Sequence, residues 1–383
     1  MRDRDAQSVK RWTAPAFVLA AVLFAAAFPA SAATAQEDAR GRLAAIFAVR
    51  ADLRQAFLSD WTAVPSPKTA GMRTLEDWAR LYGSKEYPVE LGWYASGAVP
   101  AKETSAPPKA LALRPSAYVP ELRAGASFDF GKLSAEAVLV IDVATRDVLL
   151  SRNAHEPWPL ASITKLMTAM VTLDHRVPMA RNARITADDE VGGARLRVAP
   201  GSTLSVRAIF DAMLVGSANN AANALSRTTK LARKDFIAEM NAKAGALGLR
   251  ATSFVDPTGI EPENVSTAED VAALALEAFA VPDIRRATTT AQVTVVTAAR
   301  QVHTVKSTDG LLTDEKNGLY VLGGKTGYLD ESRWNFVVKM RDARNKPVLV
   351  VVLGSDSQNG SFADAATAAK WVWDNYRWAP AKK

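Results

Sequence analysis

The hydrophobic pattern between residues 135 and 376 changes period three times, and the order of these changes constrains the fold more than any other feature. Two β-rich runs, at 137–143 and 148–150, flank a short turn, which predicts a hairpin. Helical periodicity then predicts helices at 162–173, 205–215, 220–231, 234–246 and 267–279. Strands return at 292–298, 319–323, 334–341 and 347–353, before a last helix from Phe362 to about Tyr376. Hairpin connections make an antiparallel sheet, and the inserted helices must cover its faces, so the fold class expected is α+β.

The first 35 residues have the three parts of a secretory signal peptide. Four basic residues among the first 11 precede an apolar run at 13–30, and small-residue sites follow at 30–32 and 33–35. A membrane anchor is the alternative, but a span needs roughly 20 apolar residues. We therefore expect residues 1–35 to be cleaved, leaving a protein of the periplasm or another extracytoplasmic compartment with no stable membrane anchor.

Two further parts are predicted ahead of the large domain. Residues 36–96 form a small helical region whose crowded aromatics, such as Trp78 and Trp93, either stack on glycan sugars or build the core of that small unit. The second interpretation is favoured because aromatic side chains dominate small cores. Residues 97–130 are rich in Pro and Ala and are typical of a linker or an extended strap. The large domain is expected at 131–378, with a short tail at 379–383.

The composition excludes several kinds of chemistry. The chain has no cysteine, which rules out thiol catalysis and cysteine-ligated metals. Its three histidines, His155, His175 and His303, form no H-E-x-x-H cluster, and no G-x-S-x-G elbow is present. Neither a metal, a cofactor nor a Ser-His-Asp triad is therefore expected. The net charge of +7 is spread through the chain rather than clustered, so nucleic-acid binding is not predicted either.

Three short motifs occur in one order along the large domain: Ser162-Ile163-Thr164-Lys165, then Ser217-Ala218-Asn219, then Lys325-Thr326-Gly327. Each is weak alone, and Ser357-Gln358-Asn359 also matches the second pattern. The ordered set S-x-x-K, S-x-N and K-T-G indicates acyl transfer to a serine.

The first motif supplies a nucleophile and a base. Pro157 and Pro159 exclude a helix before it, and apolar residues follow at helical spacing, so Ser162 is placed in a first helical turn with Lys165 on the same face. A lysine amine can take the serine proton only when neutral, which requires burial or a nearby positive charge. Lys325 is expected to supply that charge. A capped helix with a surface lysine is the alternative for this motif alone.

The other two motifs have structural alternatives as well. Ser217 and Asn219 lie in a break between two helices, where Asn219 either points into a cleft or caps the next helix. Lys325-Thr326-Gly327 ends a predicted strand after Gly323-Gly324, which is either an ordinary bulge or a strand edge to which a peptide substrate adds.

Taken together, residues 133–376 resemble the low-molecular-mass penicillin-binding proteins, serine D,D-peptidases related to serine β-lactamases. The resemblance extends beyond the three motifs, through Pro159–Thr168, Gly216–Ala222, Asp256–Gly259, Ser266–Asp270 and Gly324–Tyr328. It implies a transpeptidase-like α-β-α sandwich with a mainly antiparallel sheet, preceded here by the small helical segment. It also implies peptidoglycan stem peptides or cross-links as substrates, and β-lactams as inhibitors.

The resemblance implies a role for each motif residue. Ser162 forms the acyl-enzyme, Lys165 is the general base, and Ser217 relays protons while Lys325 tunes the site. Asn219 binds the substrate backbone or positions Lys165. The remaining set binds substrate or stabilises the oxyanion, and comprises Thr326, Gly327 and Tyr328.

One stretch before the third motif departs from the family pattern. The family often has an Asn-Thr-Asn-like stretch before K-T-G, whereas residues 303–311 here read HTVKSTDGL.

The absence of a further β domain and of an amphipathic tail favours an endopeptidase over an anchored carboxypeptidase. The alternatives are a serine β-lactamase, for which no E-x-x-x-N stretch is evident, and a silent wall-binding scaffold, against which the intact motifs argue.

The signal-peptide interpretation predicts that the exported protein begins near Gln36, because the small-residue sites end at Ala35. The intact mass of the protein recovered from the bacterial envelope tests this. A mass that still includes residues 1–35 would establish the anchor instead.

Overall fold

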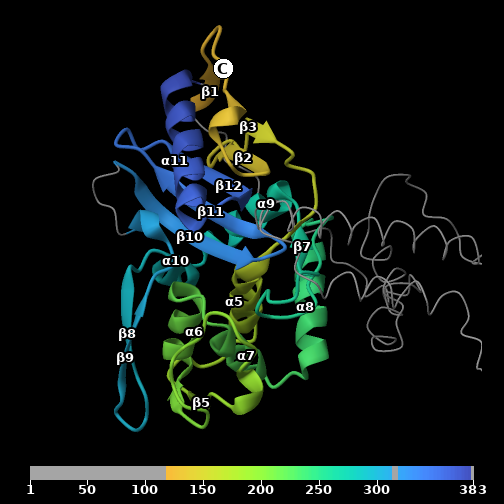
Figure 1. The fold of residues 1–383 in the computed structure, drawn as a ribbon, viewed down its shortest axis with the longest axis vertical. Helices are drawn as coiled ribbons and strands as arrows, with labels where there is room; N and C mark the ends of the chain where they lie inside the picture. The colour runs from red at the N-terminus through yellow and green to blue at the C-terminus, as the bar shows by residue number, and fades with distance from the viewer. Residues whose placement is uncertain (1–117, 313–317, 381–383) are drawn as a thin grey trace, which may run out of the picture.

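A five-stranded antiparallel sheet forms the centre of the molecule (Figure 1). The computed structural model describes residues 118–312 and 318–380, so the predictions for residues 1–117 lie outside the described residues. The order of the strands is β10-β11-β12-β2-β3, and every neighbouring pair is antiparallel. Their bounds are Ala137–Asp142 for β2, Val148–Arg152 for β3, Tyr320–Leu329 for β10, Arg333–Arg341 for β11 and Pro347–Ser355 for β12. Both predicted hairpins, β2–β3 and β11–β12, are confirmed.

The central strands are apolar along their whole length because helices cover both faces of the sheet. Alternate residues of β12 enter opposite cores: Leu349 and Val351 lie in one, Val348 and Val350 in the other. A strand covered on both sides cannot alternate apolar with polar residues. This layering confirms the predicted α+β sandwich.

The helices divide unequally between the two faces. Helix α11 (Gln358–Asn375) is the one described helix that covers one face, and α9 (Ala268–Ala280) covers the other. The remaining helices extend from the α9 side as a second lobe (Figure 1). They are α5 (Lys165–Asp174), α6 (Val206–Val215), α7 (Asn219–Thr228), α8 (Arg233–Ala246) and α10 (Pro282–Thr288).

Four short strand pairs complete the part of the fold formed by residues 118–312 and 318–380. One of them, β1 (Tyr118–Leu122) with β13 (Tyr376–Pro380), joins part of the segment expected as a linker or strap to the residues after α11. The others are β4 (Trp158–Pro159) with β7 (Val265–Ser266), β5 (Asn182–Arg184) with β6 (Thr203–Ser205), and β8 (Gln292–Val296) with β9 (Val302–Lys306).

Several element bounds differ from the predictions, for local reasons. Helix α11 begins at Gln358 rather than Phe362, because the Ser357 side chain accepts a hydrogen bond from the Gly360 N–H and caps it. Strand β10 does not end at 323, since tertiary packing keeps the K-T-G residues extended to Leu329. The seven-residue helix α10, which starts at Pro282, was not predicted, and neither was β9.

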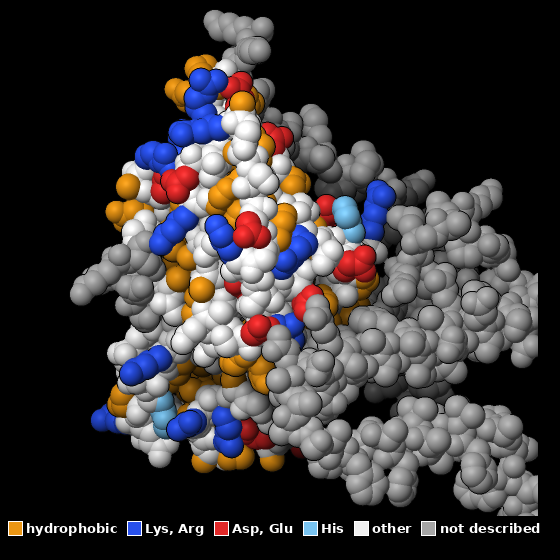
Figure 2. Space-filling model, turned by 45° about the horizontal axis from the view of Figure 1, so that its top comes forward, with side chains coloured by type: hydrophobic (Ala, Val, Ile, Leu, Met, Phe, Trp, Pro, Cys, Tyr) orange, Lys and Arg blue, Asp and Glu red, His pale blue; other side chains and the backbone are white. Residues whose placement is uncertain are grey.

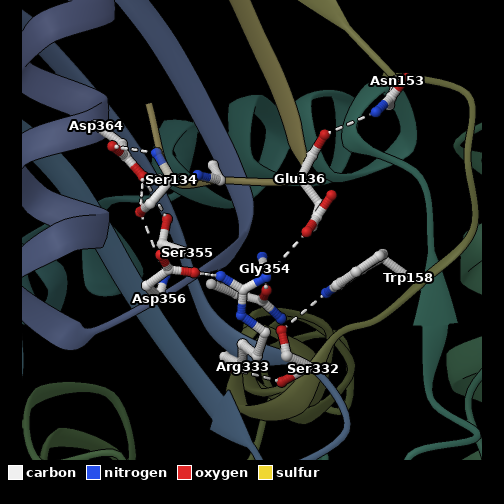
Figure 3. A network of polar contacts seen from close by, with 12 residues as sticks. Ser134, Glu136, Asn153, Trp158, Ser332, Arg333, Gly354, Ser355, Asp356 and Asp364 are labelled. Atoms are coloured by element: carbon white, nitrogen blue, oxygen red, sulfur yellow. Dashed lines mark hydrogen bonds and ion pairs between the residues drawn. The ribbon is translucent and has the colours of Figure 1, made fainter. Parts of the chain in front are cut away.

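A polar network fastens the end of the sheet to its surroundings (Figure 3). Arg333, at a positive φ of 55°, forms ion pairs with Glu136 and Asp356. Beside it, the buried carboxylate of Asp364 on α11 accepts hydrogen bonds from Ser134, Ala135 and Ser355. Helix and sheet are thereby joined by polar contacts as well as by the apolar core.

The surface carries mixed charge on the side that Figure 2 presents, where basic and acidic side chains are interspersed. Among residues 118–312 and 318–380, no helix has both the length and the apolar character needed to cross a membrane.

The two-sided burial of the sheet predicts how two apolar substitutions will differ. Leu139→Ala should lower the free energy of unfolding by about 2–5 kcal/mol, because Leu139 is 2% exposed and its loss leaves a cavity. Val148→Ala is the control on the neighbouring strand, since Val148 is 54% exposed. Equal losses in urea titrations of the two variants would contradict this description of the core.

Candidate active site

Ser162 lies in a 3-10 turn, Ala161–Thr164, that runs directly into α5. The preceding chain is held by the Asn335 amide, which donates to the Pro159 carbonyl at 2.8 Å, and by the Asn264 carbonyl, which accepts from the Leu160 N–H at 2.7 Å. Ala161 has a positive φ of 49°. This strained residue turns the chain so that Ser162, alone in the turn, remains partly exposed.

Lys165 begins α5, three residues after Ser162, and is completely buried. Its Nζ lies 2.7 Å from Ser162 Oγ, 2.7 Å from Asn219 Oδ1 and 2.5 Å from the Thr258 carbonyl oxygen. The two motif side chains therefore share a face, as the spacing predicts, and the surface-lysine alternative is wrong.

Burial lowers the pKa of Lys165 from 10.5 to about 7, while the charge of Asp256 acts to raise it. The expected cause was the charge of Lys325. Burial is the larger cause, and the repulsion between the two lysines is reciprocal, so the charge of each one favours the neutral form of the other. The pKa of Lys325 lies well below 10.5 through burial and then through the charge of Lys165. An amine with a pKa near 7 is partly neutral at neutral pH and can accept a proton.

The second motif brings one side chain to each lysine. Ser217, at a positive φ of 58°, turns its Oγ toward Lys325 Nζ at 2.9 Å. Asn219 is the first residue of α7, but its side chain makes no cap. Its Oδ1 accepts from Lys165, and its Nδ2 donates to the Gly192 carbonyl at 2.8 Å. The capping alternative for Asn219 is therefore wrong, and its side chain instead contacts Lys165.

The third motif lies inside β10, the end strand of the sheet as described. Lys325 Nζ points toward Ser217 and also donates to the Thr326 carbonyl at 2.8 Å. A side chain at Gly327 would lie 2.7 Å from the Leu160 carbonyl oxygen, so only glycine lets β10 approach the Ser162 turn this closely. A bulge lies between Val321 and Gly323.

The stretch that departs from the family pattern packs against this strand. Thr308 Oγ1 lies 2.6 Å from Thr326 Oγ1, and the buried Asp309 acts electrostatically on Lys325. Burial raises the pKa of Asp309 to about 6. Tyr328 is exposed and donates to Asp330, so its side chain is not part of the lysine network.

The sequence did not assign a role to Asp256 or Thr258, although their segment belongs to the resemblance. Thr258 contributes a backbone carbonyl, which no side-chain motif can reveal. Asp256 acts on Lys165 through space and through that carbonyl. In the assembled site the nucleophile Ser162 is hydrogen-bonded to Lys165, a base of lowered pKa, and the Lys325–Ser217 pair lies beside them. Acyl transfer requires such an arrangement.

The sequence model of the D-alanyl-D-alanine carboxypeptidase family matches residues 124–357, more than half of the chain. The chain belongs to this family. It is therefore a serine-type D-alanyl-D-alanine peptidase, a hydrolase.

Three relatives illustrate the likeness. A D-alanyl-D-alanine endopeptidase of Pseudomonas aeruginosa is 35% identical over 246 residues, which cover 63% of this chain and 78% of that protein. A D-alanyl-D-alanine carboxypeptidase of Bacillus subtilis is 26% identical over 255 residues, covering 65% and 64%. The structure of a penicillin-binding protein from Listeria monocytogenes in the ampicillin-bound form has a TM-score of 0.55 and 29% identity, covering 63% and 98%.

The close packing around Gly259 predicts that alanine will be tolerated less well there than at Gly248. Gly259 (φ 80°) and Gly248 (φ 75°) share the left-handed conformation, but a Cβ at 259 would overlap the Ala161 carbonyl oxygen, whereas one at 248 meets nothing within 4 Å. Gly248→Ala should cost about 1–2 kcal/mol from backbone strain alone and leave the site intact. Gly259→Ala should cost more and slow labelling by benzylpenicillin, because the Ser162 turn must move. Equal effects on unfolding and labelling would refute the close contact.

Proposed function

We propose that Ser162 attacks the carbonyl carbon of a D-alanyl peptide bond of peptidoglycan and forms an acyl-enzyme. The observation that carries this proposal is the 2.7 Å contact between Ser162 Oγ and the Nζ of a buried Lys165 whose pKa is about 7. Lys165 takes the hydroxyl proton as the Oγ–C bond forms. Water then hydrolyses the ester and regenerates Ser162.

The other motif residues act on the leaving group and the oxyanion. Ser217, paired with Lys325, passes a proton to the amine as the C–N bond breaks. We assign the oxyanion hole to the backbone N–H groups of Ser162 and Tyr328, as the family resemblance implies. The end position of β10 in the described sheet supports the addition of the substrate peptide to its edge, beside Thr326 and Gly327. Thr326 holds the substrate carboxylate or the cross-link carbonyl.

We propose further that the bond cleaved is a cross-link rather than the stem terminus. The relative named an endopeptidase is 35% identical, against 26% for the one named a carboxypeptidase, and this difference supports the endopeptidase type. The substrate is a wall polymer, so the protein acts outside the cytoplasm, in accordance with the signal peptide expected at residues 1–35. β-Lactams are expected as acylating inhibitors, as the ampicillin-bound relative suggests.

Acylation is tested with benzylpenicillin by intact mass. The protein should gain one penicilloyl adduct that decays slowly, and Ser162→Ala should gain none. Ser357→Ala, in the chance match to the second motif, is the control and should label like the unchanged protein. Absence of an adduct on the folded protein would reject the acylating serine, and loss within seconds would indicate a β-lactamase.

Bond choice is tested with two purified muropeptides, a cross-linked dimer and a pentapeptide monomer. Mass spectrometry should detect conversion of the dimer to monomers without release of free D-alanine from the pentapeptide. Ser162→Ala should leave both unchanged. Preferential release of D-alanine would assign the carboxypeptidase activity instead.

A further inference from the structure

Lys165 faces three oxygen atoms, two of which can only accept hydrogen bonds. The Thr258 carbonyl has no proton to give. The same holds for Asn219 Oδ1, because the Asn219 amide orientation is fixed by its Nδ2, which donates to Gly192. A neutral amine has two N–H donors and one lone pair, so these two acceptors use both donors. The lone pair is left for the Ser162 hydroxyl, which must then donate.

The Thr258 carbonyl is held in place by one buried carboxylate. Asp256 Oδ1 accepts from the Thr258 N–H at 2.5 Å, from the Thr258 hydroxyl at 2.6 Å and from the Gly259 N–H at 2.9 Å. Its Oδ2 accepts from the Glu261 N–H at 3.0 Å and from Asn264 Nδ2 at 2.6 Å. Five donors converge on a side chain with no exposed surface, and the loop from 256 to 264 closes around it.

We propose that Asp256 is a positioning residue for Lys165: it fixes the Thr258 carbonyl that orients the amine, and its negative charge stabilises the ammonium formed when Ser162 gives up its proton. The inference rests on the proposed function, since it concerns the acylation of Ser162. In that step the hydroxyl proton moves to the Nζ lone pair as Oγ bonds to the substrate carbon. The resulting ammonium has three donors and keeps the Thr258 and Asn219 contacts.

Two charged groups act directly on Lys165: Asp256, which favours its ammonium form, and Lys325, which disfavours that form. From the same loop, Glu261 faces Asp256 and has a raised pKa, through burial first and then through Asp256 and Glu263. Lys325, on β10, interacts electrostatically with Lys165, and the nearby Asp309 acts to raise the pKa of Lys325. The Asn219 side chain from α7 and the Ser162 side chain carry no charge. Only Asp256 opposes the effect of burial on the pKa of Lys165.

The test is the pH dependence of the second-order rate of benzylpenicillin acylation. Acylation needs neutral Lys165, so the rate should rise with pH and level off above a midpoint near 7. Asp256→Asn removes the charge that favours the ammonium, so the midpoint should move to lower pH by about one unit. The plateau should fall about tenfold, because a less basic and less oriented amine is a poorer base.

Two further variants separate positioning from general damage. Asp364→Asn changes a buried carboxylate that also accepts several hydrogen bonds, but on the α11 side of the sheet (Figure 3). It should lose stability without moving the midpoint. Thr258→Val keeps the Asp256 charge and removes the hydroxyl donor, so its plateau should fall while its midpoint stays.

The outcomes distinguish this inference from the proposed function. A wild-type protein that is never acylated overturns the proposed function. A normal wild-type profile with an unmoved midpoint in Asp256→Asn overturns only the inference, as does an equal midpoint shift in Asp364→Asn. If Asp256→Asn does not fold, Thr258→Val decides, and an unchanged plateau there overturns the role of the loop.

Discussion

The site depends on the burial of one amine. Lys165 is enclosed completely, and the hydrogen-bond partners of its Nζ in the described chain are three oxygen atoms, from the Ser162 turn, α7 and the 256–264 loop. Burying an ammonium ion is costly, so the surroundings favour the neutral amine, and the pKa falls to about 7. The same burial that stabilises the lobe as a packed core thus makes a base out of an ordinary lysine.

The packing around this amine explains the local strain. Ala161 and Ser217 both adopt positive φ, and each stands next to or in a catalytic motif. Such conformations persist only where the surrounding structure determines them. Here Asn335 of the sheet and Asn264 of the loop hold the chain before Ser162, and the close approach of β10 at Gly327 completes the enclosure. The sheet thus packs directly against the turn that carries Ser162.

Much of the fold was predictable because burial leaves periodic traces. The hairpins and the long helices carry clear apolar patterns, and the chain order of strands and helices is enough to indicate the sandwich. The structure differs from the predictions at elements that are not marked by a periodic pattern of apolar residues. The Ser357 cap, the short helix α10 and the polar continuation of β10 all depend on hydrogen bonds or tertiary contacts that periodicity does not register.

The sequence by itself determined the family resemblance and the three motifs, because a nucleophile, a base and their partners are side chains that local spacing brings into recognisable patterns. Only the tertiary structure decided what tunes them. It buried Lys165, placed Lys325 beside Ser217, and brought in the Asp256 charge and the Thr258 carbonyl, the latter from 93 residues along the chain. Backbone acceptors and the depth of burial are properties of packing, so no pattern of residue types records them.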